Sequence, residues 1–176
     1  PVEHPRYAMA RDLGERLANA DLMVITGAGG GIMAAAHEGA GFGHSLGLNI
    51  TLPFEQHANP IVAGSDHLLP FHFFFTRKLF FVKEADALVL CPGGFGTLDE
   101  LLEVLTLIQT GKSRRRPILL FGRDFWTQLV NFDLLVQTGM VSPADLGLFR
   151  FVETAEEAWA ALDAEYGFER QDDEKA

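Results

Sequence analysis

Apolar and polar residues follow two patterns along this chain, one typical of helices and one of buried strands. Residues 5–20 set apolar side chains against charged ones at helical spacing, which predicts an amphipathic surface helix. Short apolar runs that favour buried strands or extended pieces occur at residues 21–26, 45–52, 67–71, 87–90, 117–121 and 149–152. Helical patterns lie between them at residues 32–40, 73–85, 101–109 and 125–137, and a last helix opens at 154.

Strands that alternate with helices predict an α/β fold, a doubly wound, Rossmann-like parallel sheet with helices on both faces. At 176 residues the chain suits a single nucleotide-binding domain over residues 1–168, followed by a charged tail at 169–176. The chain opens with a helix rather than a strand, so we expect that a first strand is absent. Ligands of such folds bind outside the carboxyl ends of the strands.

Two glycine-rich loops follow predicted strands, at residues 27–31 and 91–100. The second reads Cys-Pro-Gly-Gly-Phe-Gly-Thr-Leu-Asp-Glu and leads into a helical pattern. Bare N–H groups at a helix N-terminus favour an anion, and glycine lets a phosphate approach the main chain. Thr97 and Glu100 have capping-box spacing, so Thr97 is expected to cap this helix. The loop is therefore either an anion site, in one crevice with the first loop, or a plain strand-to-helix turn.

Two cations, Arg77 and Lys78, interrupt an otherwise apolar segment at residues 73–82. A helix that is apolar nearly all round is expected to be buried, in the core or in a dimer interface. Buried cations need partners because an isolated buried charge is costly. They form either a structural ion pair or contacts with a phosphate or a catalytic carboxylate, for which Glu100 is the acidic candidate.

Composition excludes several classes of function. The net charge of -10 argues against nucleic acid as a partner. The chain has one cysteine, which suits a reducing cytoplasm, and no apolar run of about 18 residues that would span a membrane. Its six histidines are scattered, so no metal site is expected. The spacing G-x-G-x-x-G fails at Ile32, and a P-loop fails at Thr106, where each motif needs glycine.

Residues 92–100 match the pattern P-G-G-x-G-T-x-x-E and thereby resemble the LONELY GUY (LOG) family. Arg77-Lys78 is similar to the arginine–lysine pair of that family, and residues 27–33 resemble its first glycine loop. The resemblance runs from about Pro5 to Glu157. Members are cytokinin riboside 5′-monophosphate phosphoribohydrolases, and relatives were long mislabelled lysine decarboxylases.

The resemblance implies a Rossmann-like homodimer or higher homo-oligomer that cleaves a nucleoside 5′-monophosphate into free base and ribose 5-phosphate. By motif match the catalytic pair would be Arg77 and Glu100. Contacts to substrate or phosphate would come from Gly29, Gly30, Asn59, Lys78, Gly93, Gly94, Gly96, Thr97 and Thr106. No metal or organic cofactor is implied.

The implied chemistry is coherent with the residues. N-glycosidic cleavage passes through an oxocarbenium-like transition state, which a carboxylate such as Glu100 can stabilise while it orients water. Arg77 can hold that carboxylate and the sugar or phosphate through its fixed, bidentate guanidinium. The alternative is a non-catalytic nucleotide or molybdenum-cofactor carrier on the same fold. Nothing in the sequence supports a pyridoxal-type decarboxylase site.

Overall fold

The structure, a computed structural model, describes residues 4–52 and 57–168. The chain divides into two compact units, Asp86–Gly167 and the remainder, which comprises Pro1–Ala85 and Phe168–Ala176. The single domain expected from the sequence stays a prediction. The charged tail at 169–176 and residues 53–56 of the segment after the second predicted strand lie outside the described residues.

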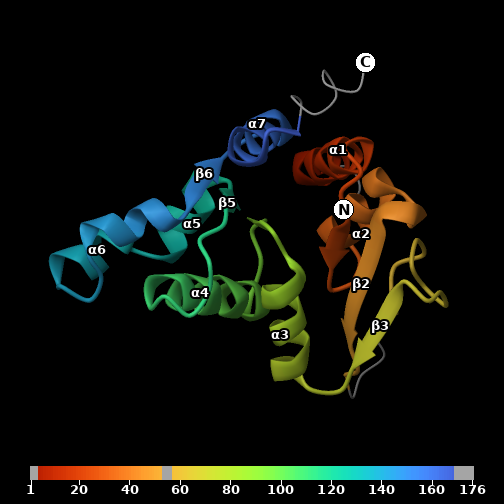
Figure 1. The fold of residues 1–176 in the computed structure, drawn as a ribbon, viewed down its shortest axis with the longest axis horizontal. Coiled ribbons are helices and arrows are strands. Elements are labelled where there is room, and N and C mark those ends of the chain that lie inside the picture. Colours follow the sequence, from red (N-terminus) through yellow and green to blue (C-terminus); the bar gives the residue numbers. More distant parts are fainter. Residues whose placement is uncertain (1–3, 53–56, 169–176) are drawn as a thin grey trace. The chain divides into compact units, whose positions relative to one another are not determined.

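The first unit is built on a three-stranded parallel sheet. Its elements are α1 (Pro5–Asn19), β1 (Val24–Thr26), α2 (Ile32–Ala40), the 3-10 helix η1 (Phe42–His44), β2 (Ser45–Ile50), β3 (Leu68–Phe71) and α3 (Phe74–Glu84). The strands lie in the order β1, β2, β3 (Figure 1). Helix α2 packs against β1, and α3 packs against β2 and β3.

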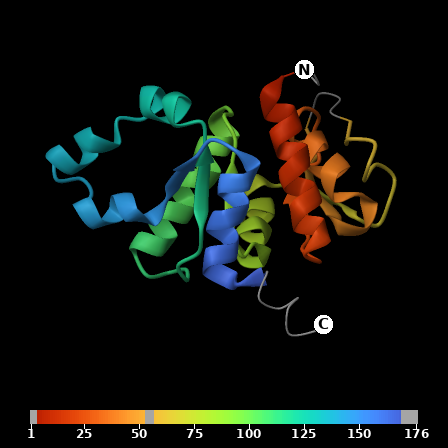
Figure 2. The same ribbon diagram turned by 90° about the horizontal axis from the view of Figure 1, so that it is seen from above.

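Helices α1 and α2 pack against each other so closely that two glycines are required (Figure 2). A Cβ on Gly39 would lie 1.9 Å from the carbonyl oxygen of Arg11. A Cβ on Gly14 would lie 2.3 Å from the carbonyl oxygen of Ala36. Because the obstructing atoms are backbone, a side chain at either position would force the helices apart. This contact fixes α2, and with it the glycine loop that leads into α2.

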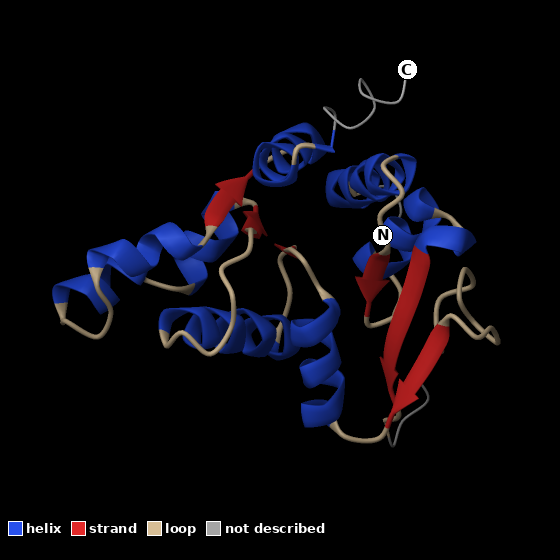
Figure 3. Ribbon diagram, viewed as in Figure 1, coloured by secondary structure: helices blue, strands red, loops and turns tan. Residues whose placement is uncertain are grey.

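The second unit also contains a three-stranded parallel sheet, in the order β4, β5, β6. Its elements are β4 (Leu88–Leu90), α4 (Phe95–Gln109), β5 (Ile118–Phe121), α5 (Arg123–Leu129), α6 (Phe132–Gln137), the 3-10 helix η2 (Pro143–Leu148), β6 (Arg150–Val152) and α7 (Ala155–Tyr166). All four residues of β5 are buried, as expected of a central strand. Helices separate its strands in the chain (Figure 3).

These parallel sheets flanked by helices confirm the predicted α/β, Rossmann-like fold class. Helix α4 ends at Gln109 as predicted, and Gly111 follows with a φ of 68°, the left-handed conformation typical of a glycine after a helix. The last helix opens at 154 as predicted, since Thr154 is the N-cap of α7 and its side chain accepts a hydrogen bond from the Glu157 N–H.

The structure contradicts the single helix predicted over 125–137 and the core location offered for residues 73–82, while the dimer-interface alternative for 73–82 stays a prediction. The single helix expected over 125–137 is broken in two, because Val130 is extended and the Asn131 side chain accepts from the Leu134 N–H to begin α6. The apolar segment at 73–82 forms α3, but no α3 residue is buried in the described chain. Its exposed apolar side chains include Phe75 at 70% and Leu79 at 61%.

Candidate active site

The first glycine loop leaves β1 at Thr26 and enters α2 at Ile32. At its centre Ala28 is fully buried and has a φ of 60°, a left-handed conformation unusual for a residue other than glycine. The Ala28 N–H donates to Thr26 Oγ1 at 2.9 Å, and the Ala28 carbonyl accepts from the Asn59 N–H at 2.7 Å. Hydrogen bonds on both sides therefore hold the strained residue.

The two ends of this loop differ in exposure. Gly29 is buried, whereas Gly30 and Gly31 are exposed, and a Cβ on either of them would meet nothing within 4 Å. Gly31 is the N-cap of α2 and has a φ of 66°, so glycine is favoured there by conformation. The start of α2 is accordingly open to a ligand.

Asn59, expected from the sequence to contact the substrate, lies beneath this loop and is only 3% exposed. Its Nδ2 is 3.3 Å from the carbonyl oxygen of Gly29 and 3.1 Å from Nδ1 of His37. Its Oδ1 accepts from the Ile61 N–H at 3.2 Å. The side chain thus joins the loop to α2.

His37 is a buried polar residue that the sequence analysis did not single out. Its side chain is fully buried, and its Nε2 lies 3.1 Å from Thr26 Oγ1. Burial lowers the pKa of His37 below its ordinary value, while hydrogen bonding to Asn59 and to backbone groups of Leu46 and Val24 acts in the opposite direction. In the sequence, His37 could have been noticed as a lone histidine in a helix of small residues.

Arg77 reaches the first glycine loop from α3. Its guanidinium lies over the rings of Phe74 and Phe81, at 5.3 and 5.7 Å from their centroids. Its Nη1 is 3.7 Å from the point that a Cβ on Gly27 would occupy. The adjacent Lys78 is half-buried on the same helix. The structure therefore brings one member of the predicted catalytic pair to the first glycine loop.

The second glycine loop leads from β4 into α4, and the helix begins earlier than predicted. Gly94 is the N-cap and Phe95 the first helical residue, so Thr97 and Glu100 lie inside the helix. The predicted cap at Thr97 is wrong, because the backbone already turns helical after Gly94. A Cβ on Gly93 would lie 2.2 Å from Thr97 Oγ1, so the threonine side chain occupies the space that this glycine leaves.

The remaining candidates lie along the loop and α4. Gly93, Gly94 and Gly96 are exposed, and Glu100 is half-buried. Thr106 is exposed, and its hydroxyl donates to the Leu102 carbonyl at 2.7 Å. Arg77 belongs to the first unit and Glu100 to the second, so their pairing and the shared crevice stay predictions.

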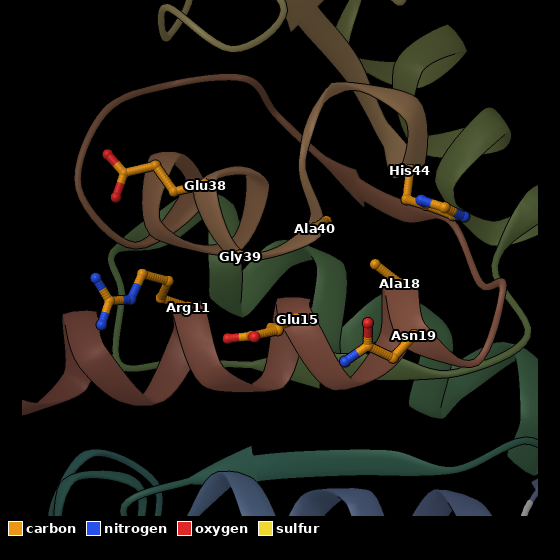
Figure 4. A pocket seen from close by; sticks show the side chains of 8 residues that line it. All are labelled: Arg11, Glu15, Ala18, Asn19, Glu38, Gly39, Ala40 and His44. Carbon is orange, nitrogen blue, oxygen red and sulfur yellow. The ribbon is translucent and has the colours of Figure 1, made fainter.

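An open groove of about 570 Å³ lies elsewhere in the first unit, lined by α1 and by the C-terminal end of α2 (Figure 4). Arg11 and Glu15 come from α1, Glu38 from α2, and His44 from η1. The first glycine loop is at the opposite end of α2. None of the predicted site residues lines this groove.

Among residues 4–52 and 57–168, no group of three or more histidine, cysteine, aspartate or glutamate side chains is arranged to hold a metal ion. Within those same ranges no helix has the length and apolar character needed to cross a membrane.

Comparison with known proteins places these features in a family. Residues 30–162 match the family model described as "Possible lysine decarboxylase", which covers more than half of the chain. The chain is also 31% identical over 164 residues to "Probable cytokinin riboside 5′-monophosphate phosphoribohydrolase LOG4" of Oryza sativa subsp. japonica. The chain belongs to the LOG family. The resemblance seen in the sequence is thus confirmed.

Other members of the LOG family match the chain at similar identity. The chain is 31% identical over 156 residues to the cytokinin riboside 5′-monophosphate phosphoribohydrolase LOG3 of Arabidopsis thaliana, and 33% identical over 156 residues to the rice relative LOGL5. Matches to LOG4, LOG3 and LOGL5 cover 88%, 84% and 81% of this chain, and 68%, 70% and 59% of those proteins. The X-ray structure of TM1055 resembles this fold with a TM-score of 0.60 and 22% identity, over 93% of each chain.

Proposed function

We propose that this LOG-family protein hydrolyses the N-glycosidic bond of a nucleoside 5′-monophosphate and releases free base and ribose 5-phosphate. The observation that carries the proposal is the second glycine loop, which opens α4 and is followed on that helix by the half-buried carboxylate of Glu100. The names of the relatives, all phosphoribohydrolases of cytokinin riboside 5′-monophosphates, support the same reaction.

The phosphate binds at the start of α4 in this proposal. The N–H of Leu98 bonds to the Gly94 carbonyl at 3.1 Å, which leaves the N–H groups of Phe95, Gly96 and Thr97 outside the helical ladder. These donors and the positive end of the helix dipole favour an anion. Gly93, Gly94 and Lys78 complete the phosphate site. Binding energy at the phosphate then helps to orient the N-glycosidic bond, which is remote from the phosphate.

The reacting groups are Glu100 and Arg77. Glu100 stabilises the positive charge that develops on the ribose and orients the attacking water. Arg77 is the second member of the proposed catalytic pair, and its guanidinium, which lies over the rings of Phe74 and Phe81, provides a permanent positive charge that can bind the sugar or phosphate in a bidentate manner. Gly29, Gly30 and Thr106 contribute further substrate contacts.

We also propose that the protein is a homodimer or a higher homo-oligomer that contacts its copy through α3. Four apolar side chains of α3 are exposed, and the two most exposed, Phe75 and Leu79, are four residues apart and share one helix face. Exposed apolar clusters mark interaction surfaces. We propose a cytoplasmic location, because a chain with one cysteine forms no internal disulfide.

A substrate panel tests the reaction. Purified protein is incubated with AMP, isopentenyladenosine monophosphate and other nucleoside 5′-monophosphates, with the matching diphosphates and nucleosides as controls. We expect equal amounts of free base and ribose 5-phosphate from monophosphates only. Tight binding of a nucleotide without turnover across the panel would contradict the enzyme and favour a non-catalytic carrier.

A further inference from the structure

Three side chains from different elements form a polar cluster beneath the first glycine loop, which we call the loop network. Thr26 ends β1, His37 lies in α2, and Asn59 lies between β2 and β3. His37 and Asn59 are 0% and 3% exposed. Buried polar groups are costly unless they are hydrogen-bonded, so a cluster of this kind persists only when its bonds are complete.

The bonds around Asn59 define how its amide is oriented. Oδ1 accepts from the Ile61 N–H, while Nδ2 donates to the Gly29 carbonyl and to Nδ1 of His37. A reversed amide would set its NH2 group against the Ile61 N–H and its oxygen against the Gly29 carbonyl. The observed orientation is therefore the one that satisfies every partner.

The orientation of Asn59 in turn defines the protonation of His37. Because Nδ1 accepts from Asn59, the ring proton is on Nε2, which donates to Thr26 Oγ1 at 3.1 Å. Thr26 Oγ1 also accepts from the Ala28 N–H. The network therefore runs from α2 to both sides of the loop, through Asn59 to Gly29 and through Thr26 to Ala28.

We propose that Thr26, His37 and Asn59 are positioning residues that hold the first glycine loop in the geometry that binds substrate. This inference rests on the proposed function of the loop. It goes beyond the glycine and arginine motifs, because none of the three side chains needs to touch the substrate.

The conformation of the loop shows why it needs such support. Ala28 has a left-handed φ of 60°, and strained residues of this kind persist only where the surroundings over-determine them. The loop backbone bonds to network residues at Ala28 and at Gly29. Gly27 in the same loop borders Arg77 Nη1. A displaced loop would therefore alter both the open N-terminus of α2 and the surroundings of Arg77.

Protonation of His37 would break this support. A second ring proton on Nδ1 would face the Asn59 NH2 group, and Asn59 could accept it only by turning its oxygen toward the ring. That turn would break the bonds to Gly29 and Ile61. Burial is the main cause of the lowered pKa of His37, hydrogen bonds to Asn59 and to backbone groups of Leu46 and Val24 oppose it, and no charged side chain of the described residues contributes.

A pair of substitutions at Thr26 separates positioning from mere packing. Thr26→Val keeps the shape of the side chain and removes the hydroxyl, whereas Thr26→Ser keeps the hydroxyl and removes a methyl. We expect Thr26→Val to raise KM for AMP about tenfold with kcat nearly unchanged. The reason is that a loop that binds the substrate stabilises the bound ground state and the transition state equally. Thr26→Ser should keep the wild-type KM. Equal KM values for Thr26→Val and wild type would overturn the proposal.

The matched control is Ser45→Ala. Ser45 is fully buried, and its hydroxyl donates to backbone carbonyls of α2 and its C-cap, those of His37 and Gly41, rather than to a side chain of the loop network. We expect this variant to lose thermal stability and to keep the wild-type KM. A rise in KM equal to that of Thr26→Val would show that any buried hydroxyl in this unit has the same effect, and would overturn the specific role of Thr26.

Nitrogen-15 NMR of the histidine rings tests the network in the wild-type protein by a measurement that does not depend on enzymatic activity. We expect His37 to be neutral at pH 7 with its proton on Nε2. A proton on Nδ1, or a charged ring, would overturn the inference whatever the enzyme does. Should the wild type show no turnover, the dissociation constant of AMP from calorimetry replaces KM, so that failure of the reaction and failure of the network are distinguished.

Discussion

At the scale of single residues, the first glycine loop depends on a glycine in the neighbouring strand. Gly47 in β2 pairs with Thr26 in β1, directly beside the place where the loop begins. A Cβ on Gly47 would lie 2.7 Å from the Cβ of Ala28 and 2.9 Å from Leu68 Cδ1. The missing side chain therefore leaves the room that the buried, left-handed Ala28 occupies.

Gly47→Ala should accordingly destabilise the protein. Leu68 can rotate away, but Ala28 is held by its backbone bonds, so we expect a loss of about 1–3 kcal/mol in the free energy of unfolding. Chemical denaturation measures it. Gly43→Ala is the control, since a Cβ there meets nothing within 4 Å, and it should change stability by less than about 0.5 kcal/mol. Equal stabilities for the two variants would contradict this packing.

His37 also makes stability depend on pH. Burial lowers its pKa in the folded state below the ordinary value of 6.5, so the unfolded chain binds the proton more readily. The stabilisation is therefore complete above about pH 6.5 and is lost as the pH falls through the pKa of the folded state. The slope cannot exceed about 1.4 kcal/mol per pH unit for one group.

Urea denaturation between pH 7.5 and 5 measures this dependence. The wild type should lose stability below about pH 6.5 more steeply than His37→Gln, which has no titrating ring. Parallel curves for the two proteins would show that His37 titrates alike in the folded and unfolded states, against the neutral ring described here.

At the scale of elements, glycine serves two different purposes at the start of α4. Glycine is needed for packing at position 93, because a Cβ on Gly93 would collide with the side chain of Thr97. Gly96 is inside the first turn, and a Cβ there meets nothing within 4 Å. Packing among the described residues gives no reason for glycine at position 96, whereas the close approach of a phosphate does.

Gly96→Ala should therefore be stable but bind substrate poorly. Alanine in a helix is favoured over glycine by about 0.5–1 kcal/mol, so stability should stay equal or rise. The added methyl would face the phosphate, and we expect KM for AMP to rise about tenfold, or about 1.4 kcal/mol of binding. Steady-state kinetics and thermal melting measure the two effects. A stable variant with the wild-type KM would argue against phosphate binding at this turn.

The exposed apolar side chains of α3 lead to a prediction about assembly. Leu79 is 61% exposed, so Leu79→Glu should fold but place a charge in the proposed homodimer interface. We expect light scattering to show a smaller assembly for this variant. Leu129→Glu alters another exposed leucine, 46% exposed on α5, and should leave the mass of the wild type unchanged. A monomeric wild type, or no change in Leu79→Glu, would contradict the role of α3.

At the scale of the whole molecule, local patterns in the sequence predict most of what the structure contains. The strands and both glycine loops lie where apolar runs and glycines predict them, and the family is recognisable from residues 92–100 and from Arg77-Lys78. Periodicity could not show that α3 is exposed, because an apolar helix looks the same whether its own chain or a partner covers it. The helix break at Asn131 depends on one side-chain cap within a continuous apolar pattern.

The loop network escaped prediction for a different reason. His37 and Asn59 are 22 residues apart, and their contact is made by the tertiary fold rather than by any local motif. Asn59 was singled out as a substrate contact through the family resemblance, and the structure shows its amide bonded to Gly29 and His37. Sequence alone thus located the loops, while the support beneath the first loop is visible only in the tertiary structure.

The central claim is that Glu100 provides the carboxylate for cleavage of a nucleoside 5′-monophosphate. The most direct measurement is kcat for release of free base and ribose 5-phosphate from the best monophosphate, for wild type, Glu100→Gln and Asp99→Asn. Glu100→Gln should lose roughly 100- to 10,000-fold in kcat, the usual contribution of such a group, while the exposed neighbouring variant Asp99→Asn stays near wild type. A Glu100→Gln protein with the wild-type kcat would contradict the claim.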